Sequence, residues 1–266
     1  MVEYRWVSCD SIINQIVGED RLFFGNYTLD PYQKCDIGCI YCDASDEVVY
    51  IKSNAIEILE RGIERIGNGT VIIGSTVDPY QMIEKEQRLT QRVIDILVKQ
   101  GIKFHILTKS DLVLRDLPLF RKYKNAGITI SISTLNKTYA KTLEPNAPSP
   151  EKRLETIKKL SENGVNVGVA IMPILPLITE VEIDEIIRLS KKAGARYLIY
   201  EYLELKGDYK EKFLSFVRKF IPQHFELYER LYENNYKPEN YNIEKKIEVY
   251  CKKHNMRIGF RDANEG

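Results

Sequence analysis

Short apolar runs alternate with amphipathic stretches of helical length along most of the chain, and this alternation limits the possible folds more than any other feature. Strand-like runs occur at 70–74, 103–108, 128–133, 165–172 and 197–202, and helical periodicity occurs at 55–66, 89–99, 112–124, 150–163 and 180–192. A further strand is expected at 23–29. Strands that alternate with helices form parallel sheets built from βα units. The sequence therefore predicts an α/β fold, a partial (β/α)6 barrel of the TIM type with parallel strands.

From about Asp208 the pattern changes to helices only, at 210–220, 223–233 and 243–254. We expect a barrel core over residues 1–205 and a helical C-terminal extension over residues 206–266 that packs on the barrel. The extension is rich in tyrosine, namely Tyr228, Tyr232, Tyr236, Tyr241 and Tyr250. These rings either pack the helices onto the barrel and cover an open edge, or they form an aromatic platform for a planar substrate.

The composition excludes several classes of protein. Apolar residues make up 44% and charged residues 29% of the 266 residues, and the net charge is +1. No apolar run reaches the length of about 18 residues that a membrane span needs, and the near-neutral charge does not favour duplex nucleic acid as a partner. The N-terminus lacks a signal-peptide pattern, and an odd number of partly clustered cysteines is not a disulfide framework. We therefore expect a cytoplasmic monomer.

Three of the five cysteines, Cys35, Cys39 and Cys42, have the spacing C-x3-C-x2-C. Three thiolates on one loop can ligate three irons of a [4Fe–4S] cube and leave the fourth iron open, because four cysteines would saturate the cluster. The same thiols with a distant Cys or His could instead bind zinc in a tetrahedral site, and Cys9 and Cys251 are available for this. No second short Cys or His pair is present, which favours the cluster.

Several stretches around and after these cysteines carry a family resemblance. They are NYTLDPY at 26–32, GSTVDPY at 74–80, LTKSDL at 107–112, SIS at 131–133, LEPNAPS at 143–149 with Arg153 after it, and IMPILP at 171–176. Together with the aromatic residue before the last cysteine of the triad, this ordered set resembles the radical S-adenosylmethionine (SAM) superfamily, and within it the spore-photoproduct-lyase-like proteins. The resemblance extends from about residue 23 to about residue 203.

The resemblance implies a radical SAM enzyme. Cys35, Cys39 and Cys42 would be the metal ligands of a [4Fe–4S] cluster, and the amino and carboxylate groups of SAM would bind the fourth iron. Reductive cleavage of SAM would give a 5′-deoxyadenosyl radical that abstracts hydrogen from an unknown substrate, in a lyase or transferase-type reaction. A small electron donor such as a ferredoxin or flavodoxin would supply the electron.

The resemblance also implies which residues bind SAM on the cluster side. Tyr41 would approach the adenine, and its alternative role is packing. Gly74 allows close approach of the backbone, and the hydroxyls of Ser75 and Thr76 either meet the amino group of SAM or cap the turn after the strand. Asp78 would add an acceptor, although Asp-Pro is also common in turns.

Charged residues later in the chain complete the expected SAM site. Lys109 and Arg153 can bind the SAM carboxylate, and Glu144 can bind the ribose hydroxyls or the amino group. The alternative is an ordinary ion pair between Glu144 and Arg153 at the mouth of the barrel.

Polar side chains also occur on the predicted strands. Ser131 and Ser133 are two residues apart and should therefore share a face of their strand. Buried hydroxyls are costly without partners, so a polar ligand or buried water is expected there. His105 lies on an apolar strand, and we interpret it as a core histidine.

The chain departs from spore photoproduct lyase where that enzyme would donate a hydrogen atom. The lyase has a cysteine at the end of the strand after the cluster and a tyrosine directly after its third cluster cysteine. This chain has Ser75 and Thr76 in the first region and Asp43 at the second position. Because a hydroxyl O–H bond is much stronger than a thiol S–H bond, the same cleavage of a thymine adduct is not expected.

Three functions remain open from the sequence. The leading hypothesis is a radical enzyme that abstracts hydrogen from an undetermined small or medium-sized substrate. A second is repair or modification of a nucleic-acid base. A third is a non-catalytic iron–sulfur or zinc protein used for binding or electron transfer, and it leaves the stretches at 74–78 and 144–153 without a role.

Overall fold

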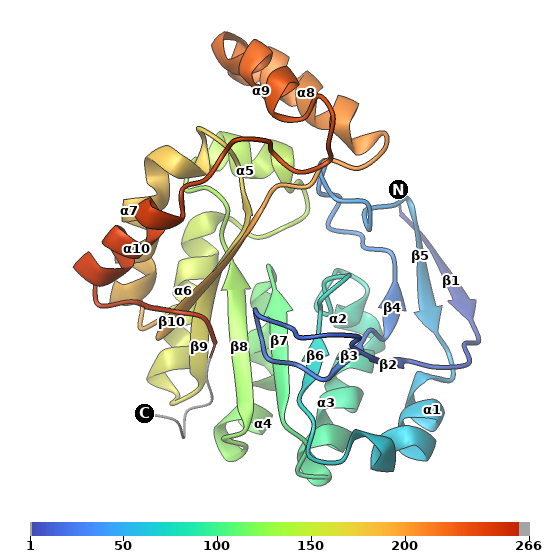
Figure 1. The fold of residues 1–266 in the computed structure, drawn as a ribbon. Helices are drawn as coiled ribbons and strands as arrows, with labels where there is room; N and C mark the ends of the chain where they lie inside the picture. The colour runs from blue at the N-terminus through green and yellow to red at the C-terminus, as the bar shows by residue number, and fades with distance from the viewer. Residues whose placement is uncertain (1, 261–266) are drawn as a thin grey trace.

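The computed structural model describes residues 2–260 of the chain, and its central sheet has the strand order β11-β10-β9-β8-β7-β6-β3-β2. Seven neighbouring strands of this sheet, from β3 to β11 in that order, run parallel, and β2 is antiparallel to β3. This arrangement confirms the predicted partial barrel (Figure 1). The strands are β2 (Ile13–Gln15), β3 (Tyr27–Leu29), β6 (Val71–Ile73), β7 (Phe104–Thr108), β8 (Ala126–Ser131), β9 (Asn166–Ile174), β10 (Tyr197–Tyr202) and β11 (Arg257–Ile258).

Helices connect the parallel strands, and α4, α6 and α7 lie together on one face of the sheet in Figure 1. Local signals explain several boundaries: Ser149 accepts a hydrogen bond from the Lys152 N–H at the start of α6, and Pro150 occupies the first turn. The helices are α1 (Ala55–Gly62), η1 (Ile63–Ile66), α2 (Glu84–Gln87), α3 (Leu89–Lys99), η2 (Asp111–Asp116), α4 (Leu117–Lys122), α5 (Lys137–Leu143), α6 (Pro150–Glu162), α7 (Thr179–Lys192), α8 (Tyr209–Phe220), η3 (Pro222–His224), α9 (Phe225–Leu231) and α10 (Glu244–Lys253).

Alternate residues of each strand face opposite sides of the sheet, as the period of a strand requires. On β8, Ile128 and Ile130 belong to the large apolar core that lies between the strands and the helices. A second, smaller cluster occupies the concave inner side and contains Ala170 of β9 and Tyr197 of β10. The inner side of the barrel is therefore filled at one end by side chains, and only its other end is open to a ligand.

Aromatic rings form the floor of this inner side. The His105 ring lies 4.5 Å from the ring of Phe23 and 4.4 Å from that of Phe260. Glycines make room for these rings: a Cβ on Gly127 would lie 2.4 Å from Phe260, and a Cβ on Gly168 would lie 2.2 Å from the Tyr197 ring. Glycine is thus required on these strands by packing against the aromatic floor.

A second, small sheet was not predicted from the sequence. It consists of β1 (Glu3–Val7), β5 (Val48–Lys52) and β4 (Tyr32–Gln33), with β1 parallel and β4 antiparallel to β5. Residues 34–47 join β4 to β5 and contain the three clustered cysteines, and we call them the cluster loop. The small sheet therefore holds both ends of this loop beside the barrel.

The prediction that the chain contains only helices after Asp208 was wrong at its end. The strand β11 pairs in parallel with β10 and extends the sheet by one strand. Two residues paired at a sheet edge are too short to produce a period in the sequence. Figure 1 shows α8 and α9 packed together beyond the end of the sheet to which the β8 arrow points.

Three of the five tyrosines named in the C-terminal extension serve in packing. Tyr228 and Tyr232 are fully buried, and their hydroxyls donate to the backbone carbonyls of Pro176 and Leu203. Tyr241 packs edge-on against Tyr202 at 5.9 Å between ring centroids. Within the described part of the chain, no helix is long and apolar enough to cross a membrane.

Candidate active site

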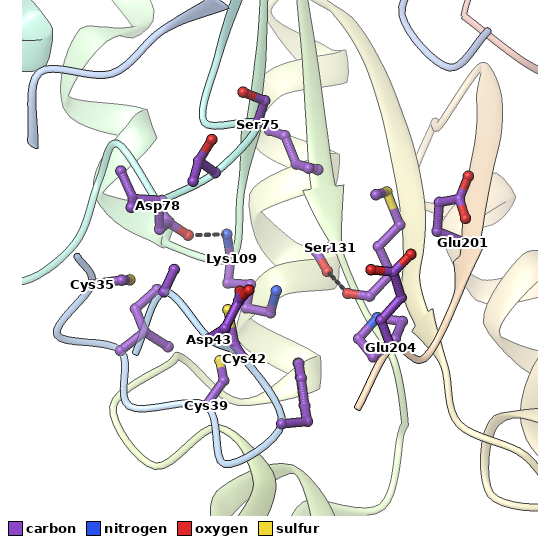
Figure 2. Close-up of a pocket in the computed structure, with 18 of the residues that line it drawn as sticks. Cys35, Cys39, Cys42, Asp43, Ser75, Asp78, Lys109, Ser131, Glu201 and Glu204 are labelled. Atoms are coloured by element: carbon purple, nitrogen blue, oxygen red, sulfur yellow. Dashed lines mark hydrogen bonds between the residues drawn. The ribbon is translucent and has the colours of Figure 1, made fainter. Parts of the chain in front are cut away.

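One cavity, of about 410 Å³, opens at the carboxyl ends of the parallel strands. Figure 2 shows its walls: the thiols of the cluster loop on one side, the ends of the central strands behind, and the end of β10 on the far side. Its lining contains most of the residues expected from the sequence, namely Cys35, Cys39, Tyr41, Cys42, Gly74, Ser75, Thr76, Asp78, Lys109 and Ser131. Ser133, Glu144 and Arg153 are not in the lining.

The cluster loop is anchored through Asp36, which follows the first cysteine. The Asp36 carboxylate accepts hydrogen bonds from the Met82 N–H at 2.8 Å and from the Tyr4 hydroxyl at 3.0 Å. Its backbone N–H donates to Gln81 Oε1 at 3.0 Å, and its carbonyl accepts from Asn146 Nδ2 at 2.8 Å. Because these partners come from separate segments, the loop has little freedom relative to the barrel.

The three thiols differ in exposure. Cys35 and Cys39 are buried, and Cys42 is partly exposed. Burial, followed by the negative charge of Asp78, raises the pKa of the Cys35 thiol to about 12, and burial also raises the pKa of Cys39. The thiolate is the form that ligates metal, so metal binding here must release protons.

The placement of the thiols bears on which metal group they could hold. Across residues 2–260, no three His, Cys, Asp or Glu side chains converge closely enough to hold one metal ion. A [4Fe–4S] cluster binds each thiolate at a different iron, so its ligands need to surround a cavity rather than to meet at a point. Three thiols that line one cavity from a single loop fit the cluster better than a tetrahedral zinc site.

The wall after β6 depends on Gly74 and Asp78. Gly74 has a φ of +93°, and a Cβ there would lie 2.3 Å from the carbonyl oxygen of Leu107, so only glycine fits without distortion. The Asp78 carboxylate accepts from the Lys109 N–H at 2.7 Å and from Thr108 Oγ1 at 2.6 Å. Asp78 therefore joins the ends of β6 and β7, and its oxygens are occupied by protein donors.

Glu144 and Arg153 form a buried ion pair behind the cavity wall. Arg153 also donates to the carbonyls of Ser131 and Pro148, so each guanidinium nitrogen has a partner within the protein. Glu144 accepts from the Tyr41 hydroxyl and lies 3.9 Å from Lys109 Nζ. Burial opposes the ionised form of Glu144, but the charges of Arg153 and Lys109 outweigh it and lower its pKa.

Ser131 and Ser133 do not share an environment, because β8 ends at Ser131. Ser131 lines the cavity, and its hydroxyl donates to the Met172 carbonyl at 2.9 Å (Figure 2). The Ser133 hydroxyl is buried elsewhere and has no hydrogen-bond partner among the described residues. The period-two argument failed at this point since the strand does not continue.

The far wall of the cavity was missed by the sequence analysis. It contains Glu201 and Glu204 at the end of β10, with Lys206 and Lys237 beside them. Glu204 pairs with Lys206 at 2.7 Å and with Lys237 at 3.0 Å. The position of Glu201 and Glu204 at a strand end could have pointed to them, whereas Lys237 reaches the site from a loop that has no sequence signal.

The comparisons with known proteins agree with this fold. A model of the Radical SAM superfamily matches residues 29–190, so the chain belongs to this superfamily. Uncharacterized protein MJ0683 of Methanocaldococcus jannaschii is 30% identical over 212 residues, which cover 76% of this chain and 78% of that protein. Uncharacterized protein Rv2578c of Mycobacterium tuberculosis is 27% identical over 262 residues, which cover 90% and 77% of the two chains.

Solved structures of two radical SAM enzymes have a similar fold. Spore photoproduct lyase complexed with dinucleoside spore photoproduct matches 97% of this chain and 82% of its own, with a TM-score of 0.67 and 14% identity. Streptococcus suis SuiB bound to S-adenosylmethionine matches 88% of this chain and 49% of its own, with a TM-score of 0.60 and 14% identity. The chain is thus a spore-photoproduct-lyase-like radical SAM protein in its fold, as the sequence motifs indicated.

Proposed function

We propose that the chain is a radical SAM enzyme in which Cys35, Cys39 and Cys42 hold a [4Fe–4S] cluster and the adjoining cavity binds SAM. When bound, these groups supply the reductive cleavage that gives the 5′-deoxyadenosyl radical, which abstracts hydrogen from the substrate. The observation that carries the proposal is that the three thiols line the same cavity as the ends of β6, β7 and β8. Its volume, about 410 Å³, lies in the range of ligand pockets.

Lys109 is the residue of the chain best suited to bind the SAM carboxylate. Burial opposes its charged form, but nearby negative charge, that of Glu144 first, outweighs this and raises its pKa, so the ammonium stays charged. Its side chain is 18% exposed and lines the cavity. Glu144 and Arg153, which are saturated by protein partners, act in this proposal by holding Lys109 and Tyr41 rather than by touching SAM.

The far wall faces the substrate in this proposal. Glu201 and Glu204 lie across the cavity from the cysteines (Figure 2), and Lys206 and Lys237 also line it. The space between the two walls is left for SAM and for the bond that is attacked. The reaction is of lyase or transferase type on a small or medium-sized substrate. A ferredoxin or flavodoxin in a reducing cytosol provides the electron.

Anaerobic reconstitution tests the proposal. The wild-type protein should bind about four irons per chain and, with dithionite and SAM, release 5′-deoxyadenosine. Cys39→Ala should lose both the iron and the product. Cys9→Ala is the matched control, because Cys9 is a partly exposed cysteine outside the cavity whose thiol donates a hydrogen bond to Asn54. A colourless wild-type protein with one zinc, or product from Cys39→Ala at the wild-type rate, would rule the proposal out.

A further inference from the structure

Two copies of the tripeptide Asp-Pro-Tyr follow neighbouring strands of the barrel, and the SAM site leaves the role of their tyrosines open. Residues 30–32 come after β3, and residues 78–80 come after β6. Tyr32 and Tyr80 are each 1% exposed, and neither lines the cavity. Both hydroxyls point instead into one buried group of ionised side chains.

That group consists of Glu84, Arg115 and Asp116, and we call it the buried triad. The Tyr32 hydroxyl donates to Glu84 Oε2, and the Tyr80 hydroxyl donates to Asp116 Oδ2 at 2.9 Å. Arg115 bridges the two carboxylates, because Nη2 donates to Glu84 Oε1 and Nε donates to Asp116 Oδ1 at 2.9 Å. The two tyrosines are thereby joined through three ionised groups.

The buried triad is saturated with hydrogen bonds. Glu84 accepts from the backbone N–H of Thr90 at 2.9 Å and of Gln91 at 3.2 Å, in addition to the donors above. Arg115 also donates to the Glu84 carbonyl at 2.9 Å. Glu84 and Asp116 are fully buried, and the Arg115 side chain is 16% exposed. Buried carboxylates are tolerated only with such complete pairing, and a saturated network of this kind has one geometry.

The buried triad reaches both walls that meet at the metal ligands. Tyr32 is on β4, three residues before Cys35, at the start of the cluster loop. Tyr80 is two residues after Asp78, whose carboxylate holds the backbone N–H of Lys109. The short segment between Tyr80 and Glu84 also bonds to Asp36 through the Met82 N–H. A shift of either tyrosine would therefore move one wall relative to the other.

We propose that the buried triad is a positioning device that couples the cluster loop to the wall formed by residues 74–78. Tyr32 and Tyr80 are positioning residues, since they act on SAM only through the segments they hold. The proposal rests on the proposed function, because it concerns the geometry between the cluster ligands and the SAM-facing wall.

A double-mutant cycle on the KM for SAM tests the coupling, with formation of 5′-deoxyadenosine as the assay. Tyr32→Phe and Tyr80→Phe each remove one hydroxyl and should raise the KM by about three- to tenfold, the equivalent of one buried hydrogen bond, while kcat changes less. The KM of the double variant should be close to that of the single variant with the higher KM, because both changes disturb one network. Effects on the KM that multiply would overturn the proposal.

Tyr197→Phe is the control. Tyr197 is as buried as the other two, and its hydroxyl bonds Thr129 at 2.7 Å in the floor of the barrel, away from the cavity. It should lower the melting temperature as Tyr32→Phe does but leave the KM within about twofold, and its effect on stability should add to that of Tyr32→Phe. A KM effect equal to that of Tyr80→Phe would show that loss of any buried hydroxyl suffices, which contradicts positioning.

Urea unfolding of the same variants before reconstitution separates this inference from the proposed function. The shifts of the unfolding midpoint for Tyr32→Phe and Tyr80→Phe should be non-additive whether or not the protein cleaves SAM. A wild-type protein that makes no 5′-deoxyadenosine would contradict the proposed function. Additive shifts of the unfolding midpoint would contradict the coupling between Tyr32 and Tyr80. Non-additive midpoints with an unchanged KM would make the buried triad a purely structural element and overturn its positioning role.

Discussion

The floor and the mouth of the barrel are built from the same strands but treat polar side chains in opposite ways. At the floor, His105 Nε2 lies 2.7 Å from Thr129 Oγ1, which lies 2.7 Å from the Tyr197 hydroxyl. At the mouth, Lys109 and Glu144 are charged neighbours, and the cysteine thiols line an open cavity. The polar side chains of the floor bind one another, whereas those that line the mouth remain accessible to a ligand.

The difference shows that position along a strand, more than residue type, decides what a polar residue does. On β8 the inward positions run from Gly127 at the floor through Thr129 to Ser131 at the mouth. Thr129 is hydrogen-bonded to Tyr197 in the floor, while Ser131 lines the cavity. Parallel strands bring their carboxyl ends to one edge, where loops can add charges and metal ligands.

The largest effect on stability should come from the ion pair behind the mouth. Arg153→Met leaves the buried Glu144 carboxylate with only Lys109 and Tyr41, and loss of one partner of a buried pair costs about 3–5 kcal/mol. Arg188→Met is the control, because Arg188 pairs with Glu185 on the surface, where a pair contributes about 0–1 kcal/mol. Urea denaturation measures both values. Equal losses would mean that the mouth does not depend on buried charge.

Gly74 should give the next effect. Gly74→Ala combines a left-handed backbone, which costs about 1 kcal/mol or more, with overpacking against the Leu107 carbonyl, which costs about 2 kcal/mol. Gly101→Ala is matched to it, because Gly101 has a φ of +69° but no atom within 4 Å of a Cβ. The free energy of unfolding should fall more for Gly74→Ala, and only this variant should raise the KM for SAM. Similar values for the two variants would show that the wall tolerates a Cβ.

His105 in the floor should make the free energy of unfolding depend on pH. Burial lowers the pKa of His105 from 6.5 to about 3, so the folded state keeps the ring neutral while the unfolded chain protonates below about pH 6.5. The unfolded state then binds more protons, and stability falls as the pH drops, by about 1.4 kcal/mol per pH unit from this residue. His105→Asn should lack this part of the slope.

Urea denaturation at pH values between 7 and 5 measures that difference. The wild type is expected to be more stable than His105→Asn at pH 7. This difference in the free energy of unfolding should be about 2 kcal/mol smaller at pH 5. The rate of SAM cleavage at pH 7, corrected for the folded fraction, should not change, because His105 is not in the cavity lining. Parallel stability curves would show that His105 protonates in the folded floor.

The smallest effect is expected at the far wall. Glu201 is exposed and has no ion pair within the described residues, so Glu201→Gln should alter the free energy of unfolding by less than about 0.5 kcal/mol. SAM cleavage without substrate should stay within about twofold of the wild type. Glu204→Gln, which breaks the pairs with Lys206 and Lys237, serves for comparison. Loss of SAM cleavage in Glu201→Gln would remove the distinction between the SAM-facing and substrate-facing walls.

The alternating strands and helices could be predicted from the sequence because their signals are local. Strands such as 197–202 and helices such as 89–99 were predicted with the bounds that the structure has. The small sheet β1-β5-β4 and the strand β11 were not predicted, since they consist of short strands, and β1 and β11 pair with strands far away in the chain. A two-residue strand carries no period, so only the folded chain reveals it.

For the site, the amino-acid sequence by itself determined the thiol spacing and the loops that surround it. Only the tertiary structure decided that Ser131 faces the cavity while Ser133 does not, and that Glu144 and Arg153 lie behind its wall. It also brought Lys237 to the rim from the C-terminal extension. Spacing along a loop is set by covalent geometry, whereas access to a cavity depends on where strands end and on which distant partners satisfy each charge.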